Sequence, residues 1–251
     1  MAEKREVVQV RGLTAGYGKP IQRDVSFSVR EGEVFVILGG SGCGKSTVLK
    51  HLIGLVPPLS GEIRLLGDRI WSRDPAERMR ALRHLGVTYQ SGALFGSMTL
   101  LENVCLPLEV FTSLPPDARR MVAEMKLDQV GLKEYANFFP ADISGGMKKR
   151  AAIARALALE PEILFLDEPS AGLDPVTSAE LDRLILQMRD ERGVTVVMVT
   201  HELPSIFAIA DRCIMLDRKA GTKIAEGAPA VLRDDPPNET VRRFFNREAG
   251  E

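Results

Sequence analysis

The eight residues Gly39 to Ser46, GGSGCGKS, have the types and spacing needed to hold a polyphosphate. They match the pattern G-x-x-x-x-G-K-[ST] and lie between an apolar strand, EVFVILGG, and a stretch with helical spacing, STVLKHLIGL. In such a loop the backbone N–H groups surround phosphate oxygens, Lys45 neutralises phosphate charge, and the Ser46 hydroxyl can ligate Mg²⁺. The pattern in this context predicts nucleotide binding.

A second segment, DISGGMKKRAAIARALA, also has the features of a phosphate site. A serine and two glycines stand directly before a basic, alanine-rich run that is typical of a helix. The N-terminus of a helix carries unsatisfied N–H groups and about half a positive charge, so it attracts anions. Glycines also allow a phosphate to approach the backbone closely. Two phosphate-binding segments in one chain require a common explanation.

Acidic and polar side chains follow three other predicted strands. Asp167 and Glu168 end the apolar strand of ILFLDEP, where a carboxylate can hold Mg²⁺ directly or through water. Glu168 is suited to polarise an attacking water, and His201 follows the strand VTVVMVT. Gln90, in VTYQSGALF, is a weaker candidate, because a single glutamine after a short strand is usually a surface residue. The loop after Glu168 is expected to present Asp174 away from the site.

These residues need strands and helices that alternate along the chain. The alternation in DVSFSV places Val25, Phe27 and Val29 on one face of a strand. Continuous apolar runs in EVFVILGG, EILFLDEP, VTVVMVTH and DRCIMLD predict buried strands, which helix-like segments such as Thr177 to Arg192 separate. We therefore expect an α/β fold with a mixed or parallel core sheet.

The composition predicts a further division of the chain. From Ala93 to Pro140 it shifts to Leu, Met, Phe and Pro with helical patches, which indicates an inserted helical subdomain. We place this subdomain at about 93–160 within a single domain of residues 1–251, with a C-terminal tail at about 228–251. The tail either packs on its own domain or reaches a partner subunit, where Phe244 and Phe245 would anchor it.

Composition and charge argue against several other classes of protein. The chain has 45% hydrophobic and 27% charged residues, and 33 Lys and Arg against 34 Asp and Glu give a net charge of −1, which weakens a nucleic-acid function. The start, MAEKREVVQV, lacks the apolar core of a signal peptide, and no run approaches the ~18 apolar residues of a membrane span. Cys43, Cys105 and Cys213 are too scattered for a zinc or disulfide framework, so we expect a cytosolic, reducing compartment.

In these motifs and their order, the chain resembles the ATP-binding subunit of ABC transporters over essentially its whole length. The resemblance implies a P-loop NTPase fold with an antiparallel β subdomain, and it implies bound ATP and Mg²⁺. It assigns Tyr17 to stack on adenine, Glu168 as general base, His201 to contact the γ-phosphate, and Asp174 to the D-loop. The other implied residues are the Walker A residues Gly39, Gly40, Ser41, Gly42, Cys43, Gly44, Lys45, Ser46 and Thr47, the signature residues Ser144, Gly145 and Gly146, and Ser46, Gln90 and Asp167 at the Mg²⁺.

Family architecture implies that two such subunits meet head to tail. The signature helix of one subunit would close on the γ-phosphate held by the phosphate loop of the other. One chain would then carry two half-sites, neither complete alone, which explains why two segments have the features of phosphate sites. ATP would hold the dimer together, and hydrolysis would release it, so a local charge change becomes a rigid-body motion.

Two residues of these motifs suggest separate hypotheses. The family usually has Gln after Ser-Gly-Gly, whereas this chain has Met147, which shares one helical stripe with Ala151, Ala154 and Ala158 and is expected to pack there. Cys43 lies inside the phosphate loop, whose positive field would lower the pKa of its thiol and make it redox-sensitive.

Within the family, the chain looks like the Mla-type ATPases, which serve lipid transporters built around MCE substrate-binding proteins in double-membraned bacteria. The similarity lies in SGGMKKRAAIARALALEP, GALFGSMTLLENVCLPL and THELPSIFAIADRCIML. It implies phospholipid cargo, a membrane permease and an MCE protein as partners, and a position on the cytoplasmic face of the bacterial inner membrane. Some members also bind a small STAS-domain protein. No nucleic-acid partner is expected.

The segment from Ala93 to Val110 would lie where ABC subunits receive the coupling helix of the permease, and its apolar character fits a helix in a groove. The alternative is that its apolar side chains only pack the helical subdomain, namely Leu94, Phe95, Met98 and Leu101.

Two other functions stay open from the sequence. The first is an importer or exporter ATPase of the same fold with another cargo, which only the resemblance of the stretch after Gln90 disfavours. The second is a DNA-repair or chromosome-structuring ATPase. Those proteins separate the phosphate loop from the signature by a long coiled coil, whereas Lys45 and Ser144 are 99 positions apart here, without heptads or a basic stripe.

Overall fold

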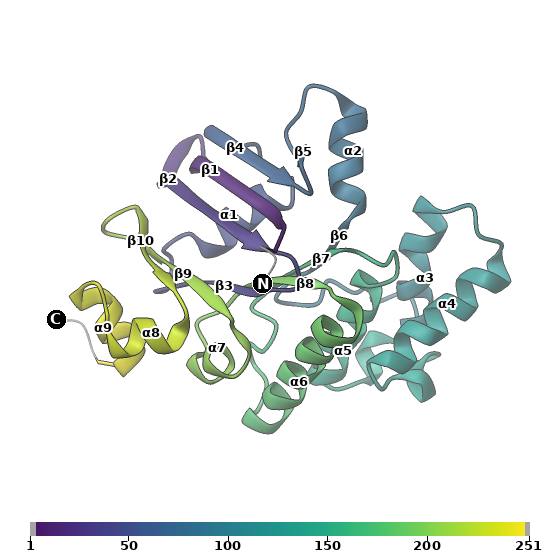
Figure 1. Ribbon diagram of the computed structural model, residues 1–251. Helices are drawn as coiled ribbons and strands as arrows, with labels where there is room; N and C mark the ends of the chain where they lie inside the picture. The colour runs from purple at the N-terminus through teal and green to yellow at the C-terminus, as the bar shows by residue number, and fades with distance from the viewer. Residues whose placement is uncertain (1–3, 249–251) are drawn as a thin grey trace.

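The computed structural model describes residues 4–248, which form two β-sheets with helices around them (Figure 1). The parts of the predicted single domain and tail that fall on residues 1–3 and 249–251 lie outside this description. The larger sheet runs in the order β10 (Thr222–Gly227), β9 (Arg212–Asp217), β3 (Val34–Gly39), β8 (Thr195–Val199), β7 (Ile163–Asp167) and β6 (Leu85–Thr88). The smaller sheet runs in the order β2 (Lys19–Arg30), β1 (Glu6–Tyr17), β4 (Ser60–Leu65) and β5 (Asp68–Arg69).

The strand directions confirm the predicted α/β fold. In the larger sheet β9, β3, β8, β7 and β6 are parallel to their neighbours, and only β10 pairs antiparallel. The smaller sheet is antiparallel throughout, as the family resemblance implied. Parallel strands end at one edge of a sheet, so the residues that follow β3, β6, β7 and β8 must lie near one another.

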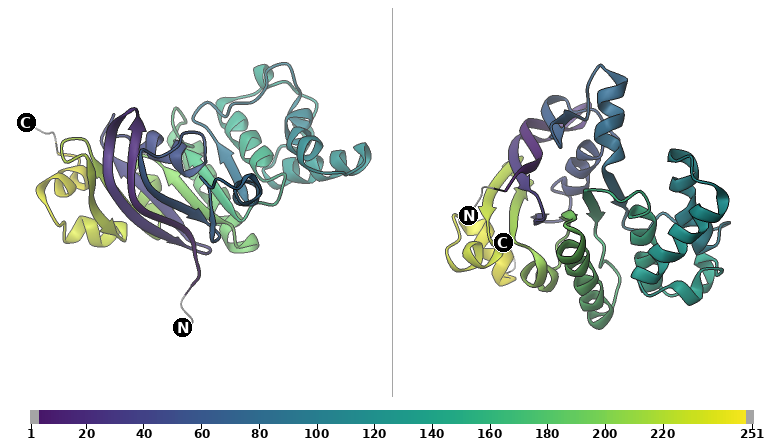
Figure 2. Two further views of the ribbon diagram at one scale, coloured as in Figure 1. Left: turned by 90° about the horizontal axis from the view of Figure 1, so that it is seen from above. Right: turned by 45° about the vertical axis from the view of Figure 1, so that its right-hand side comes forward.

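Helices cover the sheets and extend beyond them (Figures 1 and 2). They are α1 (Lys45–Leu52), α2 (Pro75–Arg83), α3 (Leu100–Phe111), α4 (Pro116–Gln129), α5 (Gly145–Ala156), α6 (Pro175–Arg192), α7 (Leu203–Ile209), α8 (Pro229–Asp234) and α9 (Glu239–Asn246), with short 3₁₀ helices at Lys133–Tyr135 and Pro140–Asp142. None of these helices of residues 4–248 combines the length and apolarity needed to cross a bilayer.

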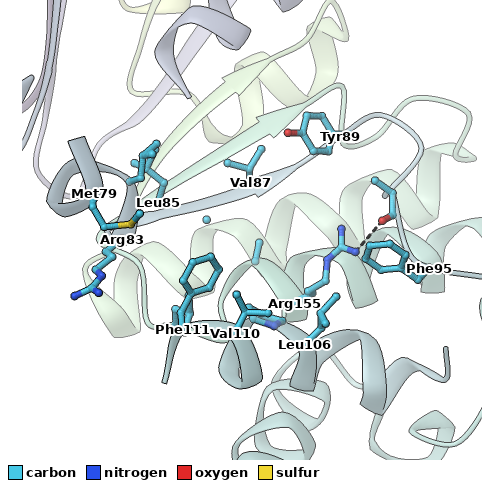
Figure 3. Close-up of a pocket in the computed structure, with 16 residues that line it drawn as sticks. Met79, Arg83, Leu85, Val87, Tyr89, Phe95, Leu106, Val110, Phe111 and Arg155 are labelled. Carbon is cyan, nitrogen blue, oxygen red and sulfur yellow. Dashed lines mark hydrogen bonds between the residues drawn. The ribbon is translucent and has the colours of Figure 1, made fainter. Parts of the chain in front are cut away.

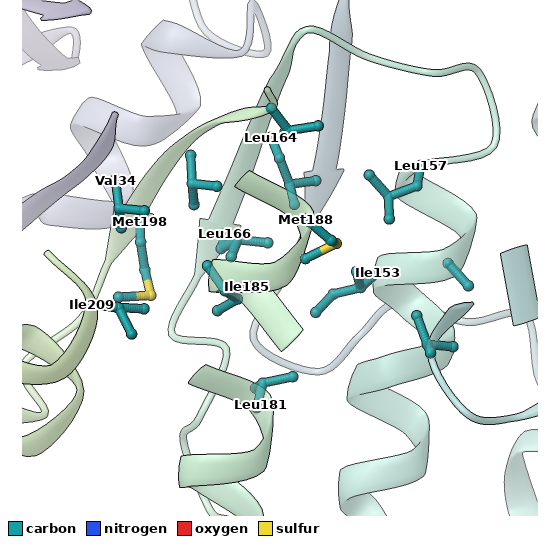
Figure 4. Packing of buried hydrophobic residues seen from close by; sticks show 14 of the residues in the cluster. Val34, Ile153, Leu157, Leu164, Leu166, Leu181, Ile185, Met188, Met198 and Ile209 are labelled. Atoms are coloured by element: carbon teal, nitrogen blue, oxygen red, sulfur yellow. The ribbon is translucent and has the colours of Figure 1, made fainter. Parts of the chain in front are cut away.

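The burial of the central strand β3 explains why its sequence is apolar without alternation. Val34, Val36 and Leu38 point into a cluster shared with α5 and α6, whose packing is seen in Figure 4. Phe35 and Ile37 point to the other face, into a cluster that joins the two sheets and α1. Both faces of the strand are therefore buried, which is the reason for the continuous apolar run.

Helices α3 and α4 lie at one end of the molecule, beyond the edge strand β6 (Figure 1). A reciprocal pair of hydrogen bonds between Thr99 and Glu102 caps the start of α3 and so fixes where this helix begins. The structure also places α5 against both α3 and α6. The boundaries of a helical subdomain at 93–160 stay a prediction.

The tail packs on its own chain as far as residue 248. Val241 and Phe245 of α9 are buried in the cluster beneath the larger sheet. The Phe245 ring lies 5.7 Å from the ring of Phe207 on α7 and 5.5 Å from that of Phe244. Within one chain this segment therefore packs on its own domain, and contact with a partner subunit stays a prediction.

Candidate active site

Four strand ends of the larger sheet meet around one cavity of about 620 Å³. The loop after β3 lines it, together with one side chain each after β6, β7 and β8: Gln90, Glu168 and His201. Phe244 of α9 and Ile21 of β2 complete the wall. The full lining is Ile21, Gly39, Gly40, Ser41, Gly42, Gly44, Lys45, Ser46, Thr47, Gln90, Glu168, His201 and Phe244.

The phosphate loop has a backbone that only glycine adopts easily. Gly39, Gly42 and Gly44 have φ angles of 148°, 70° and 103°. A Cβ on Gly39 would lie 2.3 Å from the carbonyl oxygen of Leu216, so this glycine also permits close packing. The loop leads directly into α1, whose N-terminal N–H groups and dipole favour an anion at this position.

The side chains of Lys45 and Ser46 make separate hydrogen bonds at the phosphate loop. The Nζ of Lys45 donates to the carbonyl oxygens of Gly39 and Gly40 at 2.8 and 3.1 Å. The Ser46 hydroxyl donates to Oδ1 of Asp167 at 3.0 Å, which ties α1 to the end of β7. Burial raises the pKa of Asp167, and the hydrogen bond from Ser46 opposes that rise.

Glu168 is held in a strained position beside His201. Its φ of 48° is rare for a residue with a side chain, and such strain is typical of functional sites. Oε1 accepts a hydrogen bond from Nδ1 of His201 at 2.9 Å, whereas the buried Oε2 has no hydrogen-bond partner among residues 4–248. One carboxylate oxygen is therefore fixed, and the other stays free to accept a proton.

These residues fit ATP with Mg²⁺. The glycine loop and the start of α1 offer N–H groups to phosphates, and Lys45 offers a cation. Mg²⁺ prefers oxygen ligands and is usually held by one or two protein groups together with substrate phosphates. Ser46, Asp167 and Gln90 supply such oxygens, and within residues 4–248 no cluster of three His, Cys, Asp or Glu side chains could hold a metal alone.

Two further side chains, the buried Gln22 and the partly buried Lys149, support the site without any sequence signal that marks them. Gln22 of β2 donates from Nε2 to the carbonyl oxygens of Cys43 and Asp217, at 2.6 and 2.9 Å, and so fixes the phosphate loop against β9. Lys149 of α5 donates from Nζ to the carbonyl oxygens of Gln90 and Glu168, the latter at 3.2 Å. Lys149 therefore links the helix after Ser-Gly-Gly to two residues of the cavity.

The second phosphate segment does not reach this cavity within one chain. Neither Ser144, Gly145 nor Gly146 is part of its lining. Ser144 caps α5 and accepts a hydrogen bond from the N–H of Met147 at 3.3 Å. Gly146 has a packing role as well, because a Cβ there would lie 2.6 Å from Cγ2 of Thr177 on α6.

Other predicted site residues also lie outside the cavity lining. Asp174 caps α6 and accepts hydrogen bonds from the N–H groups of Val176 and Thr177, each at 3.0 Å. Tyr17, at the tip of the β1–β2 hairpin, is 53% exposed. Asp167 does not line the cavity itself, but it accepts the hydrogen bond from Ser46 and directly precedes Glu168, and both of these residues line it.

The expectation for the Cys43 thiol was wrong in direction. Cys43 is buried in the cluster between the sheets, and its side chain does not line the cavity. Burial raises the pKa of the Cys43 thiol, and the opposing influence of Lys45 is the smaller of the two. Desolvation outweighs the positive field of the loop here, which favours the protonated thiol rather than the reactive thiolate.

The packing of Met147 gives a first prediction. Met147 is partly buried against the cluster that contains Ala151, Ala154 and Ala158, in line with the predicted helical stripe. Its side chain does not line the cavity, so replacing it with Gln, Met147→Gln, is expected to keep more than about half of the ATPase activity. Steady-state phosphate release measures this, and a collapse of turnover would show a role for the methionine beyond packing.

A second cavity, of about 610 Å³, is a groove with a mainly apolar lining between β6 and α3 (Figure 3). Leu85 and Val87 of β6 face Leu106 and Val110 of α3 across it. Arg155 of α5 lies at one end and donates to the carbonyl oxygens of Gly92 and Ala93, at 3.0 and 2.7 Å. Val110, Phe111 and Phe95 expose 62%, 54% and 51% of their surface.

Only some residues of the segment from Ala93 to Val110 line the groove. Phe95 lines it, whereas Leu101 is buried in the core and Leu94 packs against that core. Met98 is partly buried and does not line the groove. The residues of the segment from Ala93 to Val110 therefore divide between the groove and the core, and docking of a permease helix there stays a prediction.

Comparisons with known proteins agree with this geometry. A sequence model of the family described as ABC transporter matches residues 22–171. "Probable ribonucleotide transport ATP-binding protein mkl" of Mycobacterium leprae is 40% identical over 95% of this chain and 68% of its own length. "Intermembrane phospholipid transport system ATP-binding protein MlaF" of Escherichia coli K12 is 36% identical over 98% of this chain and 88% of its own length. The chain spans about two thirds of the length of the mkl proteins, 66% for that of Mycobacterium tuberculosis H37Rv.

A solved structure shows the same fold with the products of ATP hydrolysis bound. The dimeric post-hydrolysis structure of the ATP-binding cassette MJ0796 with ADP and Pi is 32% identical, with a TM-score of 0.79 over 88% of this chain and 98% of that one. The matched family region contains the phosphate loop, the Ser-Gly-Gly segment and the Asp167–Glu168 pair. This chain belongs to the ABC transporter family and is one of its ATP-binding, ATP-hydrolysing subunits.

Proposed function

We propose that this chain powers a transporter that moves phospholipid between the two membranes of a bacterium. The observation that supports this cargo is the similarity to MlaF, whose name describes intermembrane phospholipid transport and which matches 98% of this chain. The alternative is an ABC transporter with another cargo, which the name of mkl, a probable ribonucleotide transport protein, supports. Both versions use the same ATP chemistry.

In the proposed site, each side chain has one role. Bound ATP supplies the phosphoanhydride bond that is broken, and Mg²⁺ neutralises phosphate charge. Lys45 and the amides of residues 39–47 would hold the phosphates, and Ser46, Asp167 and Gln90 would hold the metal. Glu168 accepts a proton from the attacking water through its free Oε2.

The residues around this centre have supporting roles in the proposal. His201 orients Glu168, because its Nδ1 holds Oε1 of that carboxylate, and its exposed ring lines the cavity, where it would contact the γ-phosphate. Tyr17 stacks on adenine at the outer edge of the site. Asp174 shapes the loop that would meet a partner subunit.

We infer that the active form is a head-to-tail homodimer. The cavity of one chain contains the phosphate loop but not Ser144, Gly145 or Gly146, so a second copy is needed to bring the two phosphate-binding segments together. The solved cassette MJ0796 is a dimer with ADP and Pi, which supports such an arrangement. The exposed N-terminus of α5 would then close the site of the partner.

We propose that a permease helix docks in the groove between β6 and α3. The groove is apolar and open, and its exposed Val110 and Phe111 match an amphipathic helix. It lies between the larger sheet and the helical subdomain proposed at 93–160. Because Arg155 and Lys149 join α5 to the backbone of residues 90–93, movement in the groove would be transmitted to Gln90.

The remaining partners follow from the proposed cargo. A permease would hold this subunit at the cytoplasmic face of the inner membrane, and an MCE-domain protein would carry the lipid. A STAS-domain protein is a further candidate partner. No nucleic acid is proposed as a ligand.

Purification from native membranes tests the proposal and gives a second prediction. Glu168→Gln, which should bind ATP and hydrolyse it slowly, is purified with ATP from detergent-solubilised membranes of the native host. We expect mass spectrometry to find a permease, an MCE protein and phospholipid.

The same purification tests docking in the groove. Adding Val110→Asp should remove the permease, because a charge would enter the apolar groove, whereas Val231→Asp on α8 should retain it. Val231 is a matched control, since it is 59% exposed against 62% for Val110.

The outcomes separate cargo, docking and chemistry. A permease recovered with a different binding protein would keep the ATPase function and overturn the phospholipid cargo. Equal recovery of the permease from the Val110 and Val231 variants would contradict docking in the groove.

A further inference from the structure

A buried histidine outside the cavity links α1 to the tip of the β1–β2 hairpin. His51, in the last turn of α1, is fully buried. Its Nε2 accepts a hydrogen bond from the backbone N–H of Gly16 at 3.0 Å, and its Nδ1 donates to the carbonyl oxygen of Val56 at 2.8 Å. Gly16 N–H can only donate and the Val56 carbonyl can only accept, so both ring nitrogens have defined roles.

These two contacts require a neutral ring with its proton on Nδ1. A protonated imidazole would carry a hydrogen on Nε2 and would face the N–H of Gly16 with a second donor. Burial lowers the pKa of His51, which favours the same neutral form. Both hydrogen bonds of the His51 side chain therefore hold backbone groups, those of Gly16 and Val56.

The pairing of strand β1 explains why the hydrogen bond between Gly16 and His51 matters. β1 pairs with β4 only as far as Thr14, which lies opposite Ser60. Two residues later, Gly16 lies opposite Pro20 of β2 and is beyond the last paired residue of β4. A buried N–H group without a partner is costly, and His51 takes the place of the missing strand neighbour.

The same helix also contacts the next residue, Tyr17. The Nζ of Lys50 lies 5.8 Å from the centre of the Tyr17 ring. The hairpin closes tightly here, because a Cβ on Gly16 would lie 2.0 Å from the carbonyl oxygen of Lys19. The position of the Tyr17 ring thus depends on a tight turn and on two consecutive residues of α1.

We propose that His51 is a positioning residue that fixes Gly16 and thereby sets the ring of Tyr17 for the adenine of ATP. α1 begins at the phosphate loop, so one helix carries the phosphate contacts at its start and supports the adenine contact at its end. The inference rests on the proposed stacking role of Tyr17. It predicts that His51 affects the affinity for the adenine part of the nucleotide and not the affinity for phosphates.

Two conservative variants separate the two bonds of His51. In His51→Gln the side-chain amide can reach the position of Nε2, so the contact with Gly16 is kept. In His51→Asn the amide reaches only the position of Nδ1, so the contact with Val56 is kept and that with Gly16 is lost. Each is made in the full chain with Glu168→Gln, with and without Tyr17→Ala, and titrated calorimetrically with Mg-ATP and with Mg-tripolyphosphate, which lacks adenine.

We expect His51→Asn to weaken ATP binding about tenfold, the effect of one lost buried hydrogen bond, and to change tripolyphosphate binding less than about twofold. His51→Gln should bind ATP like the parent chain, and His51→Asn should have no further effect on ATP binding in a chain that carries Tyr17→Ala.

If His51→Asn weakened the binding of ATP and of tripolyphosphate equally, or did not weaken ATP binding, the inference would be overturned. If Tyr17→Ala alone leaves ATP binding unchanged, the stacking role fails and the inference fails with it. That result differs from a failure of His51 alone, in which Tyr17→Ala weakens ATP binding and His51→Asn does not.

Discussion

Glu168→Gln is expected to slow ATP turnover by about 10²–10⁴-fold, the range for loss of a general base. Glutamine has the shape of glutamate and can still contact His201, but it cannot accept a proton from water. The affinity for ATP should stay within about threefold, because the phosphate contacts of Lys45 and the loop amides are unchanged. Phosphate release under saturating ATP measures turnover, and calorimetric titration measures binding.

The matched control for this change is Glu134→Gln. Glu134 is an exposed carboxylate in the 3₁₀ helix Lys133–Tyr135 and does not line the nucleotide cavity. Its turnover should equal that of the parent chain. If Glu168→Gln lost affinity and turnover together, Glu168 would be supporting the loop rather than accepting the proton. If it kept turnover, another group would be the base.

The strands that carry the site were predictable because both of their faces are buried. The apolar runs at β3, β7, β8 and β9 correspond to strands of the larger sheet, and their shared direction places the residues that follow them at one edge. By contrast, β1 was not predicted from its own pattern. Its pairing with β2 shifts register between Val10 and Leu13 and again up to Gly16, so the buried residues do not alternate regularly.

The phosphate loop and the carboxylates were also predictable, since each follows a strand directly in the sequence. Gln22, Lys149 and Phe244 were not predicted to contact the site, because they reach it from segments distant in the sequence. The hypothesis for Cys43 failed for a related reason. Its neighbour Lys45 is visible in the sequence, but the depth of burial that raises the pKa of its thiol is set by the packing of two sheets.

Lys45→Ala and Ser144→Arg are each expected to lower ATPase activity at least about a hundredfold. Lys45→Ala removes the buried cation of the phosphate loop, and hydrogen bonds between charged groups at such a site are the strongest that a side chain makes. Ser144→Arg places a long side chain at the exposed N-terminus of α5, where the partner's phosphates would dock. Steady-state phosphate release measures both, and circular dichroism checks that each variant is folded.

A mixture of these two inactive variants should recover activity if the half-sites belong to different chains. In a head-to-tail heterodimer, both changes fall in one site, so the other site combines an intact phosphate loop with an intact Ser144. Random exchange makes about half of the dimers heterodimers with one working site, which gives about a quarter of the parent activity if the sites act independently. If Lys45 and Ser144 acted in the same chain, no mixture would contain an intact site, and activity would stay at the level of the separate variants. If both sites of a dimer must be intact for either to hydrolyse ATP, the mixture also stays inactive. In that case a heterodimer of one parent chain and one Lys45→Ala chain is inactive as well. A titration of the parent chain with Lys45→Ala therefore distinguishes this case. With that titration, the result reports which chain supplies each phosphate contact and so tests directly why this sequence carries two of them.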